Sequence, residues 1–311
     1  MKKIVVYLSI ILAILAFNAN NALSQVKFYD GLTPRILNQI NTFRAHPLSY
    51  MDSLGITTEQ IQSIWGERGL AYLSSGLSLL SLDQSLTIAA KVHLEDMFNN
   101  IYISHLSQDG LTPEERATQS EYNALLIGES IAFLCFENYI PPAQAANILL
   151  RQLFQDALLQ QTAEGAPLVF APYEDIGIAL AGSTFKIEGK TYNVYALCIE
   201  FGLPTTSSQN LLVGRVYLTD GNTKPSPNSG IKGVELNFYN IQGKMFAKTF
   251  SFPDGTFFIP KPSNEQYVYV YMHVPNGKKE PLLGKLLTAG LQRVDLSYQS
   301  DWLNLTNNGQ D

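Results

Sequence analysis

Hydrophobic residues between Thr33 and about Gln160 recur with a helical period. Thr33-Pro34 resembles a helix start with proline in the first turn, and Pro47 predicts the end of that helix. Further helix starts carry a capping residue or an early proline: Thr57, Ser81, Thr112 and Pro141-Pro142. The helix that we expect after Ser81 has a buried stripe formed by Leu82, Leu86, Ala89, Ala90, His93, Leu94 and Met97.

Strand patterns follow these helical segments. Three runs rich in β-branched and apolar residues lie at 130–136, 176–181 and 191–201. Because helices precede a pair of adjacent strands, the pattern predicts an α+β sandwich rather than repeated strand–helix–strand units. The polar segment 204–210 is then the best candidate linker.

From residue 211 the pattern changes to short alternating strands separated by turn residues. Such runs lie at 212–218, 233–239, 254–259 and 266–272, with no helical pattern between them. An antiparallel β-sandwich over 211–299 is the economical interpretation, followed by a loose polar tail at 300–311. We therefore expect two domains, 25–203 and 211–299, joined by the linker 204–210.

The first residues have the layout of a secretory signal. Met1-Lys2-Lys3 precedes an apolar run from Ile4 to Phe17, and small residues at 22–24 suit cleavage before Gln25. The alternative is a membrane anchor, but an apolar run of about 14 residues is shorter than the roughly 20 that span a bilayer. We expect segment 1–24 to be a signal peptide and the mature chain to be secreted, periplasmic or at the cell surface, without a membrane span.

Charge excludes some partners. Removal of Lys2 and Lys3 leaves 19 basic against 27 acidic residues, a net charge of about −8. Nucleic acids and anionic membrane surfaces call for a basic patch, and the densest basic pair in the sequence is Lys278-Lys279. We therefore expect no nucleic-acid partner.

The chain has two cysteines, Cys135 and Cys198, each in an apolar run typical of a strand. Buried inert thiols are one interpretation, and a single bridge between neighbouring strands is the other. A disulfide framework is excluded in either case, so hydrophobic cores must hold the fold together.

Several motifs occur in a characteristic order. They are Asn41-Thr42-Phe43-Arg44 with Leu48, the helix Leu82 to Met97 with His93 and Asp96, Ser104-His105 followed by Asp109-Gly110 and Thr112-Pro113 with Arg116, Gly128-Glu129-Ser130-Ile131-Ala132, and the closing strands Tyr173 to Ile178 and Tyr195 to Gly202. In this order, over about 170 residues, the region from Thr33 to Gly202 resembles the CAP superfamily, which includes cysteine-rich secretory proteins, venom allergens and bacterial SCP-like domains.

That resemblance implies an α-β-α sandwich with a cleft lined by two histidines and two acids, which in some members bind a divalent metal. His105 matches the first histidine and Glu129 the first acid. The second histidine normally lies in a segment that here reads 162–170 and contains none. Asp156, Glu164 and Glu200 are alternatives for the second acid, and the sequence does not choose among them.

The cleft lacks the full set of ligands that a catalytic metal site needs. A catalytic zinc site needs three protein ligands and an open position, whereas His105 and Glu129 supply two. We therefore expect at most a weakly bound divalent metal and no other cofactor. No serine lies in a nucleophile-elbow pattern, and the apolar surroundings of the cysteines disfavour a thiolate. We expect His93 to be a packed core histidine, and His46 and His273 to be incidental.

The β-rich region resembles the carboxypeptidase regulatory-like, transthyretin-type sandwich through Val213 to Tyr217, Gly233 to Phe238 and Pro253 to Ile259. Such modules are accessory, which implies spacing or partner binding. The sequence as a whole predicts an exported bacterial CAP-domain protein that binds a lipid-like molecule, a glycan or a protein without catalysis. The alternatives are a divalent-metal-dependent hydrolase and a structural or adhesive cell-surface protein.

Overall fold

A computed structural model describes residues 25–160, 162–187, 190–219, 226–240, 242–261, 267–275, 282–288 and 292–299. The predicted signal peptide 1–24 and the predicted tail 300–311 lie outside these ranges. Within them, we find no helix with the length and apolar character needed to cross a bilayer.

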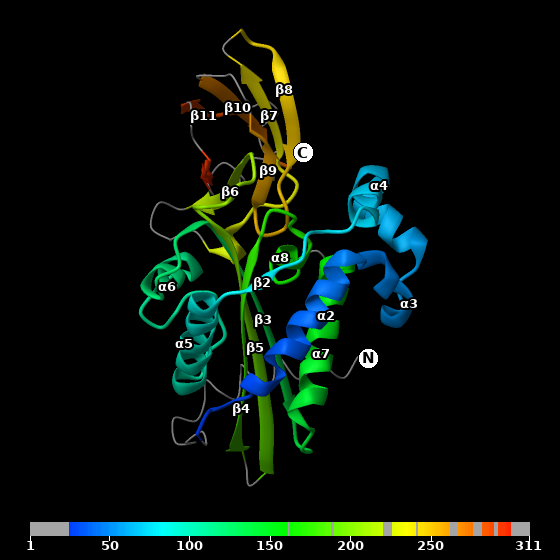
Figure 1. Cartoon of the computed structure of the whole chain (residues 1–311), viewed down its shortest axis with the longest axis vertical. Coiled ribbons are helices and arrows are strands. Elements are labelled where there is room, and N and C mark those ends of the chain that lie inside the picture. Colours follow the sequence, from blue (N-terminus) through cyan, green and yellow to red (C-terminus); the bar gives the residue numbers. More distant parts are fainter. Residues whose placement is uncertain are drawn as a thin grey trace, which may run out of the picture.

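A five-stranded sheet forms the centre of the N-terminal part (Figure 1). Its main path runs β1-β4-β5-β3, and the short β2 pairs in parallel with β4. The other pairs are antiparallel, and β3 forms one edge. The strands are β1 (Lys27–Phe28), β2 (Ser81–Leu82), β3 (Ala124–Phe136), β4 (Asp175–Ile187) and β5 (Lys190–Pro204).

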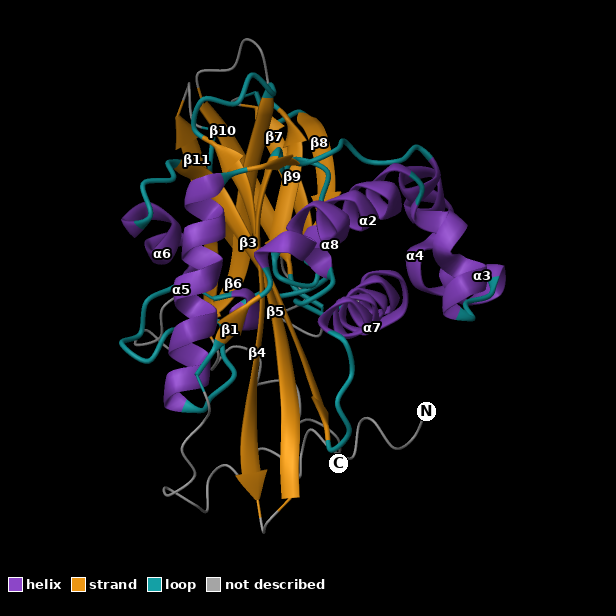
Figure 2. Ribbon diagram, turned by 60° about the horizontal axis from the view of Figure 1, so that its bottom comes forward, coloured by secondary structure: helices purple, strands orange, loops and turns teal. Residues whose placement is uncertain are grey.

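Helices cover both faces of this sheet (Figure 2). One face carries α5 (Gln84–Asn100) and α6 (Pro113–Gln119), and the other carries α2 (Thr33–Ala45) and α7 (Pro142–Gln155). Three further helices lie on the side of α2 and α7: α3 (Met51–Leu54), α4 (Thr58–Ser74) and α8 (Ala166–Val169). The predicted α+β class with a layered α-β-α arrangement is confirmed.

Local sequence signals explain most helix starts. Thr57 and Thr112 each cap a helix as predicted, and each forms a capping box, with Gln60 and Glu115 as partners. The prediction for Ser81 is wrong, because Ser81-Leu82 pairs with β4 and Asp83 caps α5 instead, its carboxylate accepting the Leu86 amide at 2.9 Å. Strand pairing here moves the helix start two residues along the chain.

The C-terminal part contains two further sheets, with strand orders β11-β10-β7-β8 and β12-β6-β9. The strands are β6 (Leu211–Thr219), β7 (Glu235–Asn240), β8 (Met245–Phe250), β9 (Thr256–Pro260), β10 (Tyr267–His273), β11 (Leu282–Thr288) and β12 (Leu296–Gln299). Pairing is antiparallel except between β12 and β6, which run parallel. Alternating patterns in the sequence predict β6, β7, β9 and β10 but not the other three strands.

The two parts meet through packed aromatic rings. Phe170, which follows α8, contacts Phe252 and Phe258 edge-on, at 5.3 and 5.5 Å between ring centroids. In addition, Arg215 on β6 donates to the carbonyl of Ile127, and Arg293 donates to that of Leu125, both at 2.8 Å. These bonds fix the C-terminal part against β3.

The segment 204–210 connects the parts and is itself held in place. The Ser207 hydroxyl donates to the Glu174 carboxylate at 2.5 Å, and the Gln209 amide donates to the same carboxylate at 2.7 Å. This predicted linker therefore follows the surface of the N-terminal part.

Both cysteines are free thiols. Cys135 on β3 lies opposite Val194 of β5, whereas Cys198 on β5 lies opposite Ile131. Four residues of strand separate the two positions, about 13 Å, which is well beyond the span of a disulfide. The alternative of a bridge between neighbouring strands is therefore wrong.

Candidate functional site

Two carboxylates lie side by side on the sheet face beneath α5 and α6. Glu129 of β3 is directly opposite Glu200 of β5, and both side chains are fully buried. Cys198 shares this face because it lies two residues before Glu200 on the same strand. Two ionised carboxylates directly opposite each other would destabilise a sheet, so this pair needs a neighbouring cation, a proton on one member, or both.

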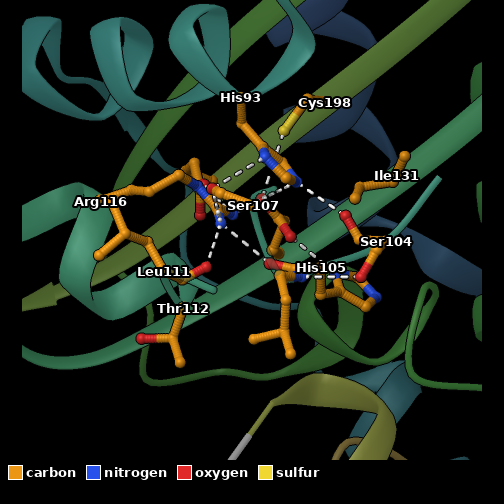
Figure 3. Close-up of polar contacts among 12 residues, drawn as sticks. His93, Ser104, His105, Ser107, Leu111, Thr112, Arg116, Ile131 and Cys198 are labelled. Carbon is orange, nitrogen blue, oxygen red and sulfur yellow. Dashed lines mark hydrogen bonds and ion pairs between the residues drawn. The ribbon is translucent and has the colours of Figure 1, made fainter. Parts of the chain in front are cut away.

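Arg116 of α6 supplies that cation (Figure 3). Its Nη2 bonds the Glu129 carboxylate and lies 3.4 Å from Glu200 Oε1. Its Nη1 donates to the carbonyls of His105 and Leu111, at 2.9 and 3.0 Å. The guanidinium thus fixes the loop before α6 and lies against both carboxyl groups.

His105 lies between two carboxylates and is 2% exposed. Its Nδ1 is 2.6 Å from Glu129 Oε1, and its Nε2 is 2.8 Å from Glu164 Oε1. Because an ionised carboxylate only accepts hydrogen bonds, both ring nitrogens donate and the ring is an imidazolium. Burial opposes the charged form, but the Glu164 charge and the bonds to both carboxylates outweigh it and raise the pKa of His105 to about 10.

Glu164 reaches His105 from the segment between α7 and α8, where the resemblance implied a histidine. Its Oε2 accepts the Ile131 amide at 2.6 Å, at the free edge of β3. Its backbone carbonyl accepts the Ser130 hydroxyl, also at 2.6 Å. These contacts hold the Glu164 carboxylate over the ring, so His105 does not face solvent.

A second imidazole lies close to Glu129. His93, on the buried stripe of α5, is fully buried and its Nε2 lies 3.8 Å from Glu129 Oε2. The same Nε2 donates to the Ser104 carbonyl at 2.8 Å, while Nδ1 is 3.5 Å from the Ser107 hydroxyl. Burial lowers the pKa of His93, so this ring is neutral. The expectation of a single imidazole in this region is wrong, although the packed role predicted for His93 agrees with these contacts.

The two central acids have opposite pKa shifts. Burial alone would raise the pKa of Glu129, but the Arg116 charge and the His105 bond lower it well below its ordinary value. Burial and the adjacent Glu129 charge raise the pKa of Glu200 well above its ordinary value. Glu129 is therefore ionised and Glu200 protonated, and the cluster balances Arg116 and His105 against Glu129 and Glu164.

The thiol of the cluster, Cys198, is not an activated nucleophile. Cys198 Sγ lies 3.5 Å from Glu129 Oε2, and burial together with that charge raises the pKa of the thiol well above its ordinary value. A buried protonated thiol is a poor nucleophile. Asp156, the third candidate acid, bonds Thr162 at 2.7 Å, and no bond joins it to His105.

The residues do not fit the divalent metal that the resemblance implied. Glu129, Cys198 and Glu200 offer ligand atoms that all lie within 4.8 Å of one another. However, the Arg116 guanidinium contacts both carboxylates, and a metal would have to displace this resident cation or bind beside it. Cys198 and Glu200 would each have to lose a proton in a buried site.

Sequence reasoning found His105, Glu129, Glu164 and Glu200 as candidates, and the structure brings all four into one cluster. It missed Arg116 as the central residue. A signal was available, because Arg116 shares the buried side of α6 with Pro113 and Ala117. A charged residue on a buried stripe indicates a buried partner of opposite charge.

Comparisons with known proteins add little to this geometry. No family model and no curated protein matches the chain. A solved structure, an extracellular protein containing an SCP domain from Bacillus anthracis str. Ames, is similar, with 22% identity and a TM-score of 0.26. The match covers 47% of this chain and 41% of that one.

Proposed function

We propose that the chain is an exported, non-enzymatic binding protein with a CAP-like N-terminal domain (25–203), a linker (204–210) and an accessory β-sandwich domain (211–299). The α-β-α layering and the order of the sequence motifs support the CAP-like assignment. The N-terminal signal pattern supports export to the cell envelope or beyond.

The proposed absence of catalysis rests on one observation: both ring nitrogens of His105 donate hydrogen bonds to carboxylates. An imidazolium has no lone pair with which to bind a metal or to accept a proton. In the same cluster, His93 is neutral but buried, and its Nε2 proton is committed to the Ser104 carbonyl. His105 and Glu129 thus serve to stabilise the fold in this proposal, with no metal between them.

Metal titration tests the proposal. We expect calorimetric titration of the full mature chain with Zn²⁺, Mn²⁺ or Ca²⁺ to give no uptake that depends on His105. The variants are His105→Ala and, because this change removes a buried partner, Glu164→Gln, which keeps the ring in place. His46→Ala is the matched control, since His46 is exposed.

Stoichiometric metal uptake by the wild type that is lost in His105→Ala but kept in His46→Ala would overturn the proposal. Metal-dependent hydrolysis of ester, amide or glycoside probes by the wild type, lost in the same variant, would do so as well and would favour the hydrolase alternative.

A further inference from the structure

The Glu164 carboxylate lies in a site built from two hydrogen-bond donors. Its Oε1 accepts from the His105 ring at 2.8 Å, and its Oε2 accepts from the backbone amide of Ile131 on β3 at 2.6 Å. One donor carries a positive charge, and the other is fixed in a strand. Two donors that converge in this way match the two oxygens of one carboxylate, and a charge-assisted bond is about twice as strong as a neutral one.

Glu164 differs from the other acids of the cluster in its exposure. Its side chain is 32% exposed, whereas Glu129 and Glu200 are fully buried on strands. It comes from the turn just before α8 rather than from the sheet. The Ser130 hydroxyl holds this turn by donating to the Glu164 carbonyl at 2.6 Å. The carboxylate can therefore leave its two donors by a rotation of the side chain towards water, while the backbone of the turn stays in place.

Departure of the Glu164 carboxylate would leave a charge imbalance in the cluster. Arg116 and His105 are cations, and Glu129 is the ionised acid that contacts both. Glu200 is protonated and adds no charge. Two buried cations would then face one buried carboxylate, and a buried charge without a partner is costly. An anion restores the balance, whereas a neutral ligand leaves it unchanged and a cation makes it worse.

We propose that the His105 ring and the Ile131 amide form a binding site for the carboxylate group of an external ligand, and that Glu164 occupies this site as an internal, autoinhibitory carboxylate. The inference rests on the proposed binding function and names the chemical group that the ligand presents. A tethered group competes at an effective concentration in the millimolar range or above. A ligand therefore displaces Glu164 when the rest of the molecule adds contacts of its own. Organic acids and peptide C-termini both carry the required group.

Glu164→Ala removes the internal competitor and tests the site. The full mature chain is titrated with acetate at about pH 6, where acetate is ionised and an ordinary histidine is largely protonated. The NMR signals of the His105 ring report binding. We expect Glu164→Ala to bind acetate with a dissociation constant of about 10 mM or below. The wild type should bind it more weakly by about tenfold or more, because Glu164 competes.

Thermal stability gives a second measurement of the same binding. A concentration of about 100 mM acetate should raise the unfolding midpoint of Glu164→Ala by about 2–4 °C relative to chloride at equal ionic strength. Acetamide, which has the shape of acetate without its charge, should have no effect. If Glu164→Ala is unfolded on its own, recovery of the native circular dichroism spectrum in acetate supports the inference, and failure to recover contradicts it.

Two further variants serve as controls. Glu137→Ala also removes an ion-paired glutamate, but one whose side chain is 51% exposed, and acetate should not stabilise it. The double variant Glu164→Ala/His105→Gln lacks the charged donor and should lose the response to acetate. A merely structural role of Glu164 would lower stability without making it depend on acetate.

Decanoate and acetyl-dialanine distinguish the two sources of the carboxylate. Tighter binding of decanoate than of acetate by Glu164→Ala supports the site with an organic acid as its ligand, and tighter binding of the peptide supports it with a chain terminus. Absence of binding by all three carboxylates overturns the inference. Equal stabilisation by acetate and chloride, or an acetate response that the double variant retains, overturns it as well. None of these results concerns metal uptake by the wild type, so the proposed function fails by a different measurement.

Discussion

Arg116 is the residue that allows two carboxyl groups to lie opposite each other inside the protein. Its guanidinium contacts Glu129 and Glu200 and anchors the loop that carries His105. Removing one member of a buried ion pair lowers the free energy of unfolding by more than the intact pair adds to it. The reason is that the remaining partner stays buried without a counter-charge.

We expect Arg116→Met to lower the free energy of unfolding by about 3–5 kcal/mol, since Glu129 loses its main counter-charge. Urea denaturation followed by circular dichroism measures the change. Lys190→Met is the control, because it breaks an exposed ion pair with Glu137 and should leave stability unchanged. A loss no larger than that of the control would contradict the central role of Arg116.

His105 predicts a pH dependence of stability. Its pKa rises from 6.5 to about 10 on folding. A raised pKa means that the folded state binds the proton more tightly, so the stabilisation is complete below pH 6.5 and is lost as pH rises towards 10. The groups facing the ring, Glu129 and Glu164, are both acids, and Arg116 contacts the first of them.

We therefore expect the free energy of unfolding to fall between pH 6.5 and pH 9 in the wild type, and to fall much less in His105→Gln. Urea denaturation at intervals of half a pH unit tests this expectation. Equal slopes in the two proteins would show that His105 is not the protonated partner. Above pH 9, the titration of cysteine and tyrosine in the unfolded chain adds to the decline.

At the scale of elements, the position of α5 depends on a residue without a side chain. Gly177 of β4 pairs with Glu200, and a β carbon at Gly177 would overlap the backbone of Leu86 in α5. Close approach of α5 to the sheet is what brings His93 to the charge cluster. Gly177 therefore sets the position of α5 and, through α5, the position of His93.

We expect Gly177→Ala to lower the free energy of unfolding by about 3 kcal/mol or more, because backbone atoms rather than a flexible side chain must move. Gly31→Ala is the matched control, since a β carbon at Gly31 meets nothing within 4 Å. Thermal unfolding of both variants measures the difference. A stable Gly177→Ala protein would mean that α5 shifts without cost.

Elements with strong local signals could be predicted from sequence, and those that depend on distant pairing could not. The caps at Thr57 and Thr112 are local, and both formed as expected. Strand β2 displaced the predicted cap at Ser81 because its pairing with β4 involves residues more than 90 positions away. The contact between Glu164 and His105 depends on how a loop follows the edge of β3, and no periodic pattern encodes such a path.

At the scale of the whole molecule, the interface makes the two parts depend on each other. Phe170 belongs to the core of the N-terminal part and packs against Phe252 and Phe258 of the C-terminal part. Arg215 and Arg293 bond carbonyls of β3 across the same interface. Separate unfolding of either part would expose these groups to water.

We expect differential scanning calorimetry to show one transition, with equal calorimetric and van't Hoff enthalpies, because the parts unfold together. Phe252→Ala should lower the midpoint while keeping a single peak, since its ring packs against the N-terminal core. Phe250→Ala is the control, because Phe250 is 47% exposed. Two separated peaks in the wild type would contradict a coupled fold.

The guanidinium of Arg116 has one more consequence. A protein with a metal ion at its centre must acquire that ion from its surroundings before it reaches its native state. Here the central cation is part of the polypeptide and arrives with synthesis. Chelators should therefore neither delay refolding nor lower the final yield of native protein, and assembly of this core should proceed equally well in metal-poor and metal-rich surroundings.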